Sequence, residues 1–340
     1  MNTTTAIGYE ANLPITDPSS LVEREIAVPS PRAHDLLVEV KAVSVNPADV
    51  KLRAQASAKN FPEGFRVLGF DAAGVVKSVG SAVTLFEPGD EVFYAGTIDR
   101  PGTNQRLHLV DERIVGRKPA TLSFAYAAAL PLTSITAWEV LFDRFGLTSA
   151  SSGTLLVVGA TGGVGSVMVQ LAEALLPKVS VIATASTPER AEYIRGLGAE
   201  YTVNHRGNLA AQVLDIAPQG VDWLFTAHSE HQLPLYAKIV RPFGQITAID
   251  DGPRNVEPLK AKSITWHWEL MFTRPVQQTP DMIAQHDLLD RVADLVDEGR
   301  LHTTVTRTLT PINAATLRQA HELVESERTV GKVVVADWEQ

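Results

Sequence analysis

The sequence contains no cysteine among its 340 residues. A chain without cysteine can form no disulfide, offers no thiolate nucleophile and cannot hold zinc or an iron–sulfur cluster through sulfur. A basic excess is also missing, because 30 Lys and Arg stand against 39 Asp and Glu, which gives a formal net charge of −9. Nucleic-acid-binding proteins normally carry a basic patch, so we expect no nucleic-acid partner.

Long apolar runs are missing as well. No uninterrupted run approaches the roughly 18 apolar residues of a membrane-spanning helix. The start of the chain, 1–10, also lacks the basic-then-apolar layout of a secretory signal. We therefore expect a soluble, cytoplasmic protein with no membrane partner, long enough for roughly two domains.

What the sequence does contain is a β-rich start and end around a middle in which strands and helices alternate. Residues 36–45 alternate apolar with polar or small side chains, as a half-buried strand does. From 154–158 onward, continuous apolar strands alternate with helical patterns, which predicts βαβ units around a parallel sheet. An amphipathic pattern from Ile283 predicts a helix that stops at Gly299. The β-like run 332–335 suggests that the tail folds back onto the first domain.

A glycine-rich segment, GATGGVG at 159–165, lies between the apolar strand 154–158 and a helical pattern. Glycines let the backbone turn tightly and approach a pyrophosphate, whose charge is met by the N–H groups of a helix N-terminus. Ala160 stands where the first glycine of the dinucleotide fingerprint is usual, but it is small enough to keep the geometry. Because both flanking elements are visible, we favour a dinucleotide site over an ordinary structural turn.

The end of the second apolar strand indicates which dinucleotide is bound. NAD sites place an acid there to hold the ribose hydroxyl, whereas NADP sites use cationic or hydroxyl groups around the 2′-phosphate. The segment 184–190 (TASTPER) has no acid at the turn itself. Ser186 can donate a hydrogen bond, and Arg190 offers a planar cationic fork suited to phosphate. We therefore favour NADPH; in the alternative interpretation Ser186 and Thr187 merely cap the helix and Arg190 is solvated.

Several motifs occur in a family-specific order. They are VNPAD at 45–49, LGFDAAGV at 68–75, FEPGDEV at 86–92, LPLTSITA at 130–137, the glycine segment at 159–165 and GKVV at 331–334. Together they resemble the medium-chain dehydrogenase/reductase superfamily, and within it the zinc-free quinone oxidoreductase-like branch.

The resemblance implies an α/β fold in which one domain is inserted into another. A GroES-like, β-rich catalytic domain would comprise 1–130 and 273–340, and a Rossmann domain with a doubly wound parallel sheet would occupy 131–272. Members of this superfamily often dimerise by joining their Rossmann sheets edge to edge. We expect a homodimer joined through the edge strand 263–272.

The same resemblance bears on zinc. Zinc-dependent relatives carry ligands at the positions of Asn46, Phe70 and Leu132, and none of these three residues is a strong zinc ligand. The stretch 95–105, where a structural zinc lobe would lie, has no sulfur. We expect no metal, and hence an enzyme that needs no Lewis acid.

The implied enzyme is an NADP-dependent oxidoreductase that transfers hydride from NADPH to a quinone or an α,β-unsaturated carbonyl. The implied site residues are Asn46 and Thr136 beside the nicotinamide and its ribose; Gly162, Gly163, Val164 and Gly165 on the pyrophosphate; and Ser186, Arg190 and His205 on the 2′-phosphate. Quinone oxidoreductases often have Tyr at the position of His205, so the chain departs from the pattern there.

Two other functions stay open. One is an NADPH-binding sensor or scaffold with little turnover, because no residue stands out as the proton donor, with Tyr94 and water as candidates. The other is an alcohol or carbonyl dehydrogenase. The segment 228–231 (HSEH), which follows the strand 221–226, has a metal-like spacing without an evident third ligand, and we interpret it as a polar loop near the cleft. We interpret 266–268 (WHW) as core or dimer interface.

Overall fold

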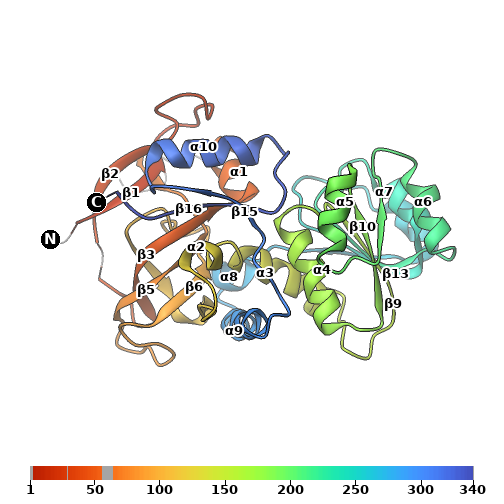
Figure 1. The fold of residues 1–340 in the computed structure, drawn as a ribbon, viewed down its shortest axis with the longest axis horizontal. Helices are drawn as coiled ribbons and strands as arrows, with labels where there is room; N and C mark the ends of the chain where they lie inside the picture. The colour runs from red at the N-terminus through yellow and green to blue at the C-terminus, as the bar shows by residue number, and fades with distance from the viewer. Residues whose placement is uncertain (1–2, 29, 56–63, 340) are drawn as a thin grey trace. The chain divides into compact units, whose positions relative to one another are not determined.

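The computed structural model describes residues 3–28, 30–55 and 64–339. Their contacts divide the chain into two compact units (Figure 1). The first unit combines Met1–Leu132 with Phe272–Gln340, and the second is Thr133–Met271. The first unit holds mostly antiparallel sheets and the second a parallel sheet between helices, so the expected α/β class is confirmed.

The first unit contains a three-stranded sheet of order β2-β1-β4 and a seven-stranded sheet of order β15-β16-β3-β5-β6-β8, in which β7 also pairs with β3. Its strands are β1 (Thr3–Tyr9), β2 (Val22–Ala27), β3 (Asp35–Val45), β4 (Arg66–Val67), β5 (Asp71–Val79), β6 (Glu91–Ala95), β7 (Leu107–Asp111), β8 (Val115–Arg117), β15 (Val305–Leu309) and β16 (Lys332–Ala336). Its helices are α1 (Pro47–Gln55), η3 (Glu112–Ile114), α2 (Phe124–Ala127), α8 (Thr273–Gln277), α9 (Ala284–Asp297) and α10 (Ala314–Glu325).

The last strand of the chain, β16, pairs antiparallel with β3, so that Val333 lies opposite Val45 (Figure 1). Its central residues Val333, Val334 and Val335 are at most 1% exposed. Burying a valine side chain contributes about 1.5–3 kcal/mol, which makes this strand a strong contributor to the core of the first unit.

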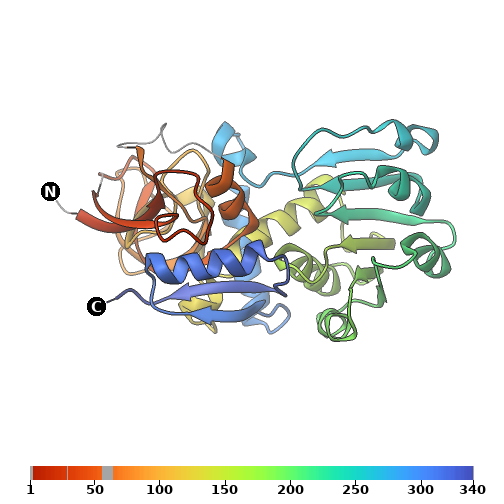
Figure 2. The ribbon, with the colours of Figure 1, turned by 90° about the horizontal axis from the view of Figure 1, so that it is seen from above.

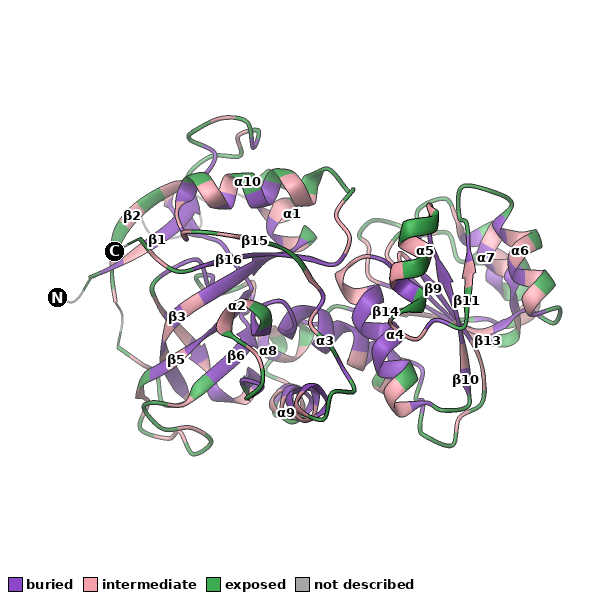
Figure 3. Cartoon of the chain, in the orientation of Figure 1, coloured by how far each residue is buried: buried purple, intermediate pink, exposed green. Residues whose placement is uncertain are grey.

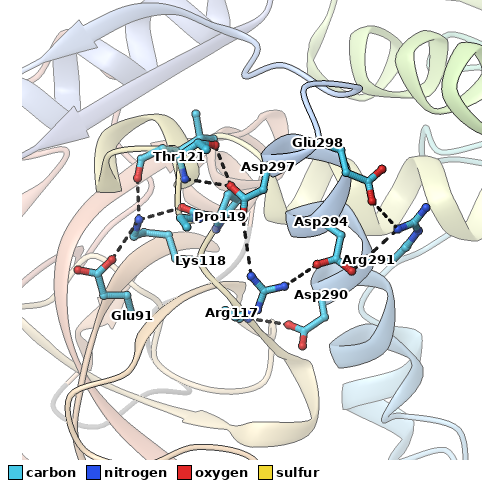
Figure 4. Close-up of polar contacts among 12 residues, drawn as sticks. Glu91, Arg117, Lys118, Pro119, Thr121, Asp290, Arg291, Asp294, Asp297 and Glu298 are labelled. Carbon is cyan, nitrogen blue, oxygen red and sulfur yellow. Dashed lines mark hydrogen bonds and ion pairs between the residues drawn. The ribbon is translucent and has the colours of Figure 1, made fainter.

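Helix α9 packs within the first unit through an apolar face and through a row of acids, whose polar contacts Figure 4 shows. Leu289 packs over Gly116, where an added Cβ would lie only 2.5 Å from the Leu289 Cβ. On the polar side, Arg117 donates to Asp294 at 2.7 Å through Nη2, and Asp297 accepts from the backbone N–H of Thr121 at 2.9 Å. The helix predicted from the amphipathic pattern is thus confirmed.

The second unit is built on a six-stranded parallel sheet of order β11-β10-β9-β12-β13-β14. Its strands are β9 (Gly153–Val158), β10 (Val179–Thr184), β11 (Tyr201–Val203), β12 (Val221–Thr226), β13 (Val240–Ala248) and β14 (Thr265–Trp268). Its helices are α4 (Gly163–Leu175), α5 (Pro188–Arg195), α6 (Leu209–Ile216), α7 (Leu233–Ile239) and η5 (Glu257–Lys262). Helix α3 (Pro131–Trp138) begins at the boundary of the two units and continues into the π-helical turn η4 (Glu139–Arg144).

Numbered within the unit, this strand order is 3-2-1-4-5-6, the arrangement of dinucleotide-binding Rossmann domains. Figure 2 shows the strands as a row of arrows. The first of them, β9, is central and its residues Leu155, Leu156 and Val157 are fully buried, as expected for a parallel strand covered on both faces. In Figure 3 the strands are mostly buried, while α5 and α6 turn exposed residues outward.

One helical stretch among the described residues, Phe124–Arg144, is long and apolar enough to cross a membrane. The most apolar 18 residues of this stretch are 78% buried inside the protein, as in a core helix.

Candidate functional site

The carboxyl ends of four neighbouring strands meet at one edge of the parallel sheet. Thr184 of β10 pairs with Val203 of β11, and Thr226 of β12 pairs with Val158 of β9. The chain order reverses between β9 and β12, and ligands of such sheets bind outside the carboxyl ends at this switch point. The glycine segment follows β9 directly and therefore lies at this position.

The glycine segment forms a tight turn into α4. Gly159 has a φ of +82°, and an added Cβ on Gly165 would lie 2.5 Å from the Ala160 Cα. Gly165 is therefore required for close packing of helix against strand. Gly162 is the N-cap of α4, and an added Cβ there would meet only the Gly159 oxygen, at 3.4 Å. Gly163 and Val164 form the first turn of this helix, whose opening N–H groups have no intrahelical acceptor and favour an anion.

Arg190 reaches this turn from the neighbouring helix α5. Its Nη1 donates to the Thr161 Oγ1 at 3.3 Å, while Thr187 caps the helix by accepting from the Arg190 backbone N–H. A cation in the first turn of a helix opposes the macrodipole, so local helix energetics do not explain this residue. Ser186 lies half-buried in the bend just before the cap. The capping interpretation thus holds for Thr187, but Arg190 contacts the glycine turn.

No acid stands at the end of β10, where an NAD site would place one. The strand ends at Thr184, whose hydroxyl accepts from the Gly159 N–H at 3.0 Å. Glu189 is on α5, but its carboxylate bonds to Thr187, and this hydrogen bond lowers its pKa. The carboxylate charge is therefore held at the helix cap.

Two histidines stand beside this turn. His205 follows β11, and its pKa is lowered by partial burial and by the positive charges of Arg206, His228 and Arg190. His228 follows β12, and its Nε2 lies 3.8 Å from the point where a Cβ on Gly159 would be. The sequence predicts a polar loop at His228 from its position just after a strand of the parallel sheet, the same position that His205 has. It does not predict the approach of the His228 ring to Gly159.

In the first unit, Asn46 lies in a buried polar network. Its Nδ2 donates to the Asp71 Oδ2 at 2.8 Å, and its Oδ1 accepts from the Lys332 Nζ at 2.5 Å. Lys332 also donates to Asp71 at 3.0 Å and to the Val45 carbonyl at 3.3 Å. The network fixes the amide of Asn46 between a buried cation and a buried anion, and Lys332 is a residue of it that sequence reasoning did not single out.

Two further acids, one in each unit, act as hydrogen-bond acceptors for backbone N–H groups. Asp49 accepts from the backbone N–H groups of Asn46 and Gly69, and its complete burial raises its pKa to about 7. Asp222 of the second unit accepts from the Thr154 N–H at 2.7 Å. Both tie loops and strands together.

Thr136 is buried in α3, in the second unit, at 4% exposure. One turn later Glu139 forms a carboxyl pair with Glu269, which follows β14. Burial and the neighbouring Glu139 raise the pKa of Glu269 to about 9, although Arg144 donates to it at 2.7 Å. Thr136 and Asn46 belong to different units.

Tyr94, a candidate proton donor, is fully buried in the first unit. Its hydroxyl bonds to the His108 Nδ1 at 3.0 Å, the two rings are stacked, and burial raises its pKa. These contacts make Tyr94 a core residue, which removes it as a candidate.

The residues at the family's zinc positions do not fit a zinc ion. Asn46 has both side-chain polar atoms engaged, and Phe70 packs its ring against Phe272 at a centroid distance of 4.7 Å. The side chain of Leu132 has no atom that can bind a metal, and its backbone N–H donates to Asp71. Over the residues that the structure describes, no three His, Asp or Glu side chains gather in a metal-binding group. His231 of the HSEH segment is 88% exposed in its side chain.

Two family models match the chain. An alcohol dehydrogenase GroES-like domain covers residues 32–124, and a zinc-binding dehydrogenase covers 197–335. Among curated proteins, the zinc-type alcohol dehydrogenase-like protein of Staphylococcus epidermidis is 35% identical over 97% of this chain and 98% of its own length. The chloroplastic NADPH-dependent alkenal/one oxidoreductase of Arabidopsis thaliana is 29% identical over 92% of this chain and 75% of its own length.

Solved structures are similar as well. A protein of Rhizobium etli CFN 42, assigned to the zinc-dependent alcohol dehydrogenases, matches with 50% identity and a TM-score of 0.95 over 100% of both chains. The Escherichia coli quinone oxidoreductase, solved with NADPH, matches with 23% identity and a TM-score of 0.80 over 98% of this chain and 99% of its own. At that identity the likeness concerns the fold alone.

Proposed function

This chain belongs to the medium-chain dehydrogenase/reductase superfamily of oxidoreductases, and from that premise we propose that it is a zinc-independent reductase which transfers hydride from NADPH to a quinone or an α,β-unsaturated carbonyl. Its family uses a nicotinamide cofactor and small-molecule substrates.

The observation that carries the choice of cofactor is the contact between the Arg190 guanidinium and Thr161 at 3.3 Å. It places a planar cation against the turn that faces the dinucleotide, and the adjacent strand ends in Thr184 instead of an acid. A guanidinium pairs well with a phosphate, whereas a carboxylate at that position would repel one. Both features favour the 2′-phosphate of NADPH.

We assign each proposed site residue a role in binding the cofactor or in positioning the substrate. Gly162, Gly163, Val164 and Gly165 would receive the pyrophosphate, and Ser186, Arg190 and His205 the 2′-phosphate. Bound NADPH supplies the hydride, and the protein orients it and excludes water. Asn46 and Thr136 would position the nicotinamide and the substrate; for Asn46 the buried Lys332 and Asp71 hold the amide in one orientation.

The proposed substrate class follows from Asn46, Phe70 and Leu132, which stand where zinc-dependent relatives have metal ligands. Without a Lewis acid to polarise an alcohol or a simple ketone, the acceptor must stabilise the arriving charge by its own conjugation. Quinones and enones do so. The similarity to the alkenal/one oxidoreductase of Arabidopsis thaliana supports the same class.

The experiment is to mix the full chain with NADPH and a panel of quinones and enones and to follow oxidation of the cofactor. We expect oxidation with at least one class and little with simple ketones, with or without added zinc. Tight NADPH binding with no oxidation over the panel would favour the sensor or scaffold instead. Oxidation of simple alcohols with NADP⁺ that depends on added zinc would favour the dehydrogenase.

A further inference from the structure

We propose that His205 and His228 complete, together with Arg190, a phosphate receptor that takes up a proton when NADPH binds, so that selectivity for NADPH over NADH rises as the pH falls. This inference rests on the proposed function, because it concerns the same cofactor. It adds one binding residue, His228, and one linked proton.

The sheet register brings the two histidines to opposite sides of the glycine turn. The strands lie in the order β11-β10-β9-β12. His205 follows the end of β11 by two residues and His228 follows the end of β12 by two. Between them, β9 leads into the turn and β10 leads to Arg190.

The contacts show the same convergence. Arg190 touches the turn at Thr161, and the His228 ring lies beside it at Gly159, 3.7 Å by its Cδ2 from the Cβ position. The ring of His205 is close enough to feel the charges of both Arg190 and His228. Both histidines are exposed residues, so a ligand can reach them.

Two acids on the surrounding segments have basic partners of their own, Glu230 with His231 and Asp250 with Arg254. Glu189 bonds to the Thr187 hydroxyl and keeps its negative charge, so it remains one carboxylate beside the basic groups. Arg206, on the loop after β11, adds one more positive charge near His205. Arg190 and His228 lie at the turn, and His205 and Arg206 lie within electrostatic range of them. With Glu189 counted against them, the basic groups are still in excess, which suits a dianion.

The excess of basic groups determines whether His205 is protonated with and without the phosphate. Without a phosphate, partial burial and the surrounding cations lower the pKa of His205, so its ring is mostly neutral at neutral pH. A dianionic phosphate in the cluster favours the protonated ring and draws one proton from solvent onto the imidazole. NADH lacks that phosphate and binds without the proton. Linkage then requires the affinity for NADPH to rise as the pH falls.

The test is calorimetric titration of the full chain with NADPH and with NADH, in phosphate-free buffers of different ionisation enthalpies at about pH 7.5, above the second phosphate pKa of about 6. We expect net proton uptake with NADPH and none with NADH. The sign is diagnostic, because a phosphate that loses its own proton in a cationic site would release protons. The affinity ratio of NADPH to NADH should rise by up to about tenfold from pH 8 to pH 7.

Two variants and one control variant test which histidine takes up the proton. H205N should abolish the uptake and H228N should reduce it, both with NADH affinity retained, which also shows that each variant is folded. H231N, in the same loop as His228 but 88% exposed and paired with Glu230, should match the wild type. NADPH binding without proton uptake, or uptake unchanged in H205N and H228N, overturns this inference and leaves the proposed reductase standing. NADPH affinity no higher than that for NADH overturns the proposed cofactor as well.

Discussion

Arg190 is the residue at which cofactor selectivity can be separated from cofactor binding. Its contact with Thr161 lies at the side of the glycine turn, whereas the N–H groups of α4 serve any dinucleotide. We expect Arg190→Ala to weaken NADPH binding by about 10- to 100-fold, since a hydrogen bond to a charged group contributes about 1.5–3 kcal/mol. NADH affinity should change little. Fluorescence titration of both cofactors measures this.

Arg195→Ala is the matched control, because Arg195 ends the same helix and its Nε donates only to the Ala191 carbonyl there. It removes the same charge from the same helix and should leave both affinities unchanged. Equal losses for NADPH and NADH in the Arg190 variant would contradict the assignment of the phosphate site.

Glu269 provides a residue-level test of the buried carboxyl pair. Its folded-state pKa is raised from 4.5 to about 9 by burial and by Glu139, so the folded protein binds a proton that the unfolded chain releases. Stability is then greatest below the unfolded pKa and falls as the pH rises through the window up to about 9. We expect Glu269→Gln to flatten this decline, measured as thermal midpoints between pH 5 and pH 9. A variant whose decline matches the wild type would show that the pair holds no shared proton.

Single residues also mark the limit of sequence reasoning. The lack of an acid after β10 and the presence of Arg190 could be predicted from the sequence, because both concern positions within a few residues of a recognisable strand end. Lys332 could not, because its partners Asn46 and Asp71 are 286 and 261 positions away. For His228 the sequence predicts only a polar loop after a strand, because the approach of its ring to Gly159 depends on the pairing of β12 with β9.

At the scale of elements, two glycines of the turn between β9 and α4 have different roles: Gly165 is needed for packing, and Gly162 for cofactor binding. Gly165→Ala would place a Cβ 2.5 Å from the Ala160 Cα, and such overpacking costs about 1–3 kcal/mol. We expect a lower free energy of unfolding in urea together with weaker binding of both cofactors. Gly162→Ala meets only one atom at 3.4 Å, so it should keep nearly normal stability and lose cofactor affinity. Equal destabilisation by both substitutions would contradict this division.

Elements with strong local patterns were predictable from the sequence. The strand β9, the helix α4 after the glycines and the amphipathic α9 all have periodicities that tertiary contacts reinforce. The π-helical turn η4 was not predictable, because its residues 139–144 are ordinary helix formers, and nothing local distinguishes them from the end of α3. The strands β1 and β2 carry weaker patterns, because β2 alternates between half-buried and exposed residues.

For the whole molecule, the edge of the parallel sheet is the place to test the proposed homodimer. Strand β14 is the last of its sheet, and Trp268 and Leu270 at its end are 48% and 52% exposed. Unpaired sheet edges with apolar side chains favour pairing with another chain. We expect a dimer by light scattering, converted to monomer by Leu270→Lys with Trp268→Glu.

Leu85→Lys, an exposed apolar residue of the first unit at 38%, is the control and should leave the dimer intact. A wild-type monomer at micromolar concentration, or a dimer that survives the double substitution, would contradict pairing through β14.

The pairing of β16 with β3 has a consequence for the order in which the protein forms during synthesis. Residues of β3 leave the ribosome early, but their partner Val333 and its neighbours are translated much later. The parallel-sheet unit, Thr133–Met271, is contiguous in sequence and can fold while the remaining chain is still being made. The first unit cannot be completed until β16 has been made, since a long loop must close before β16 pairs with β3. A chain truncated before Lys332 would thus leave β3 with an open edge and the Asn46–Asp71 network without its cation.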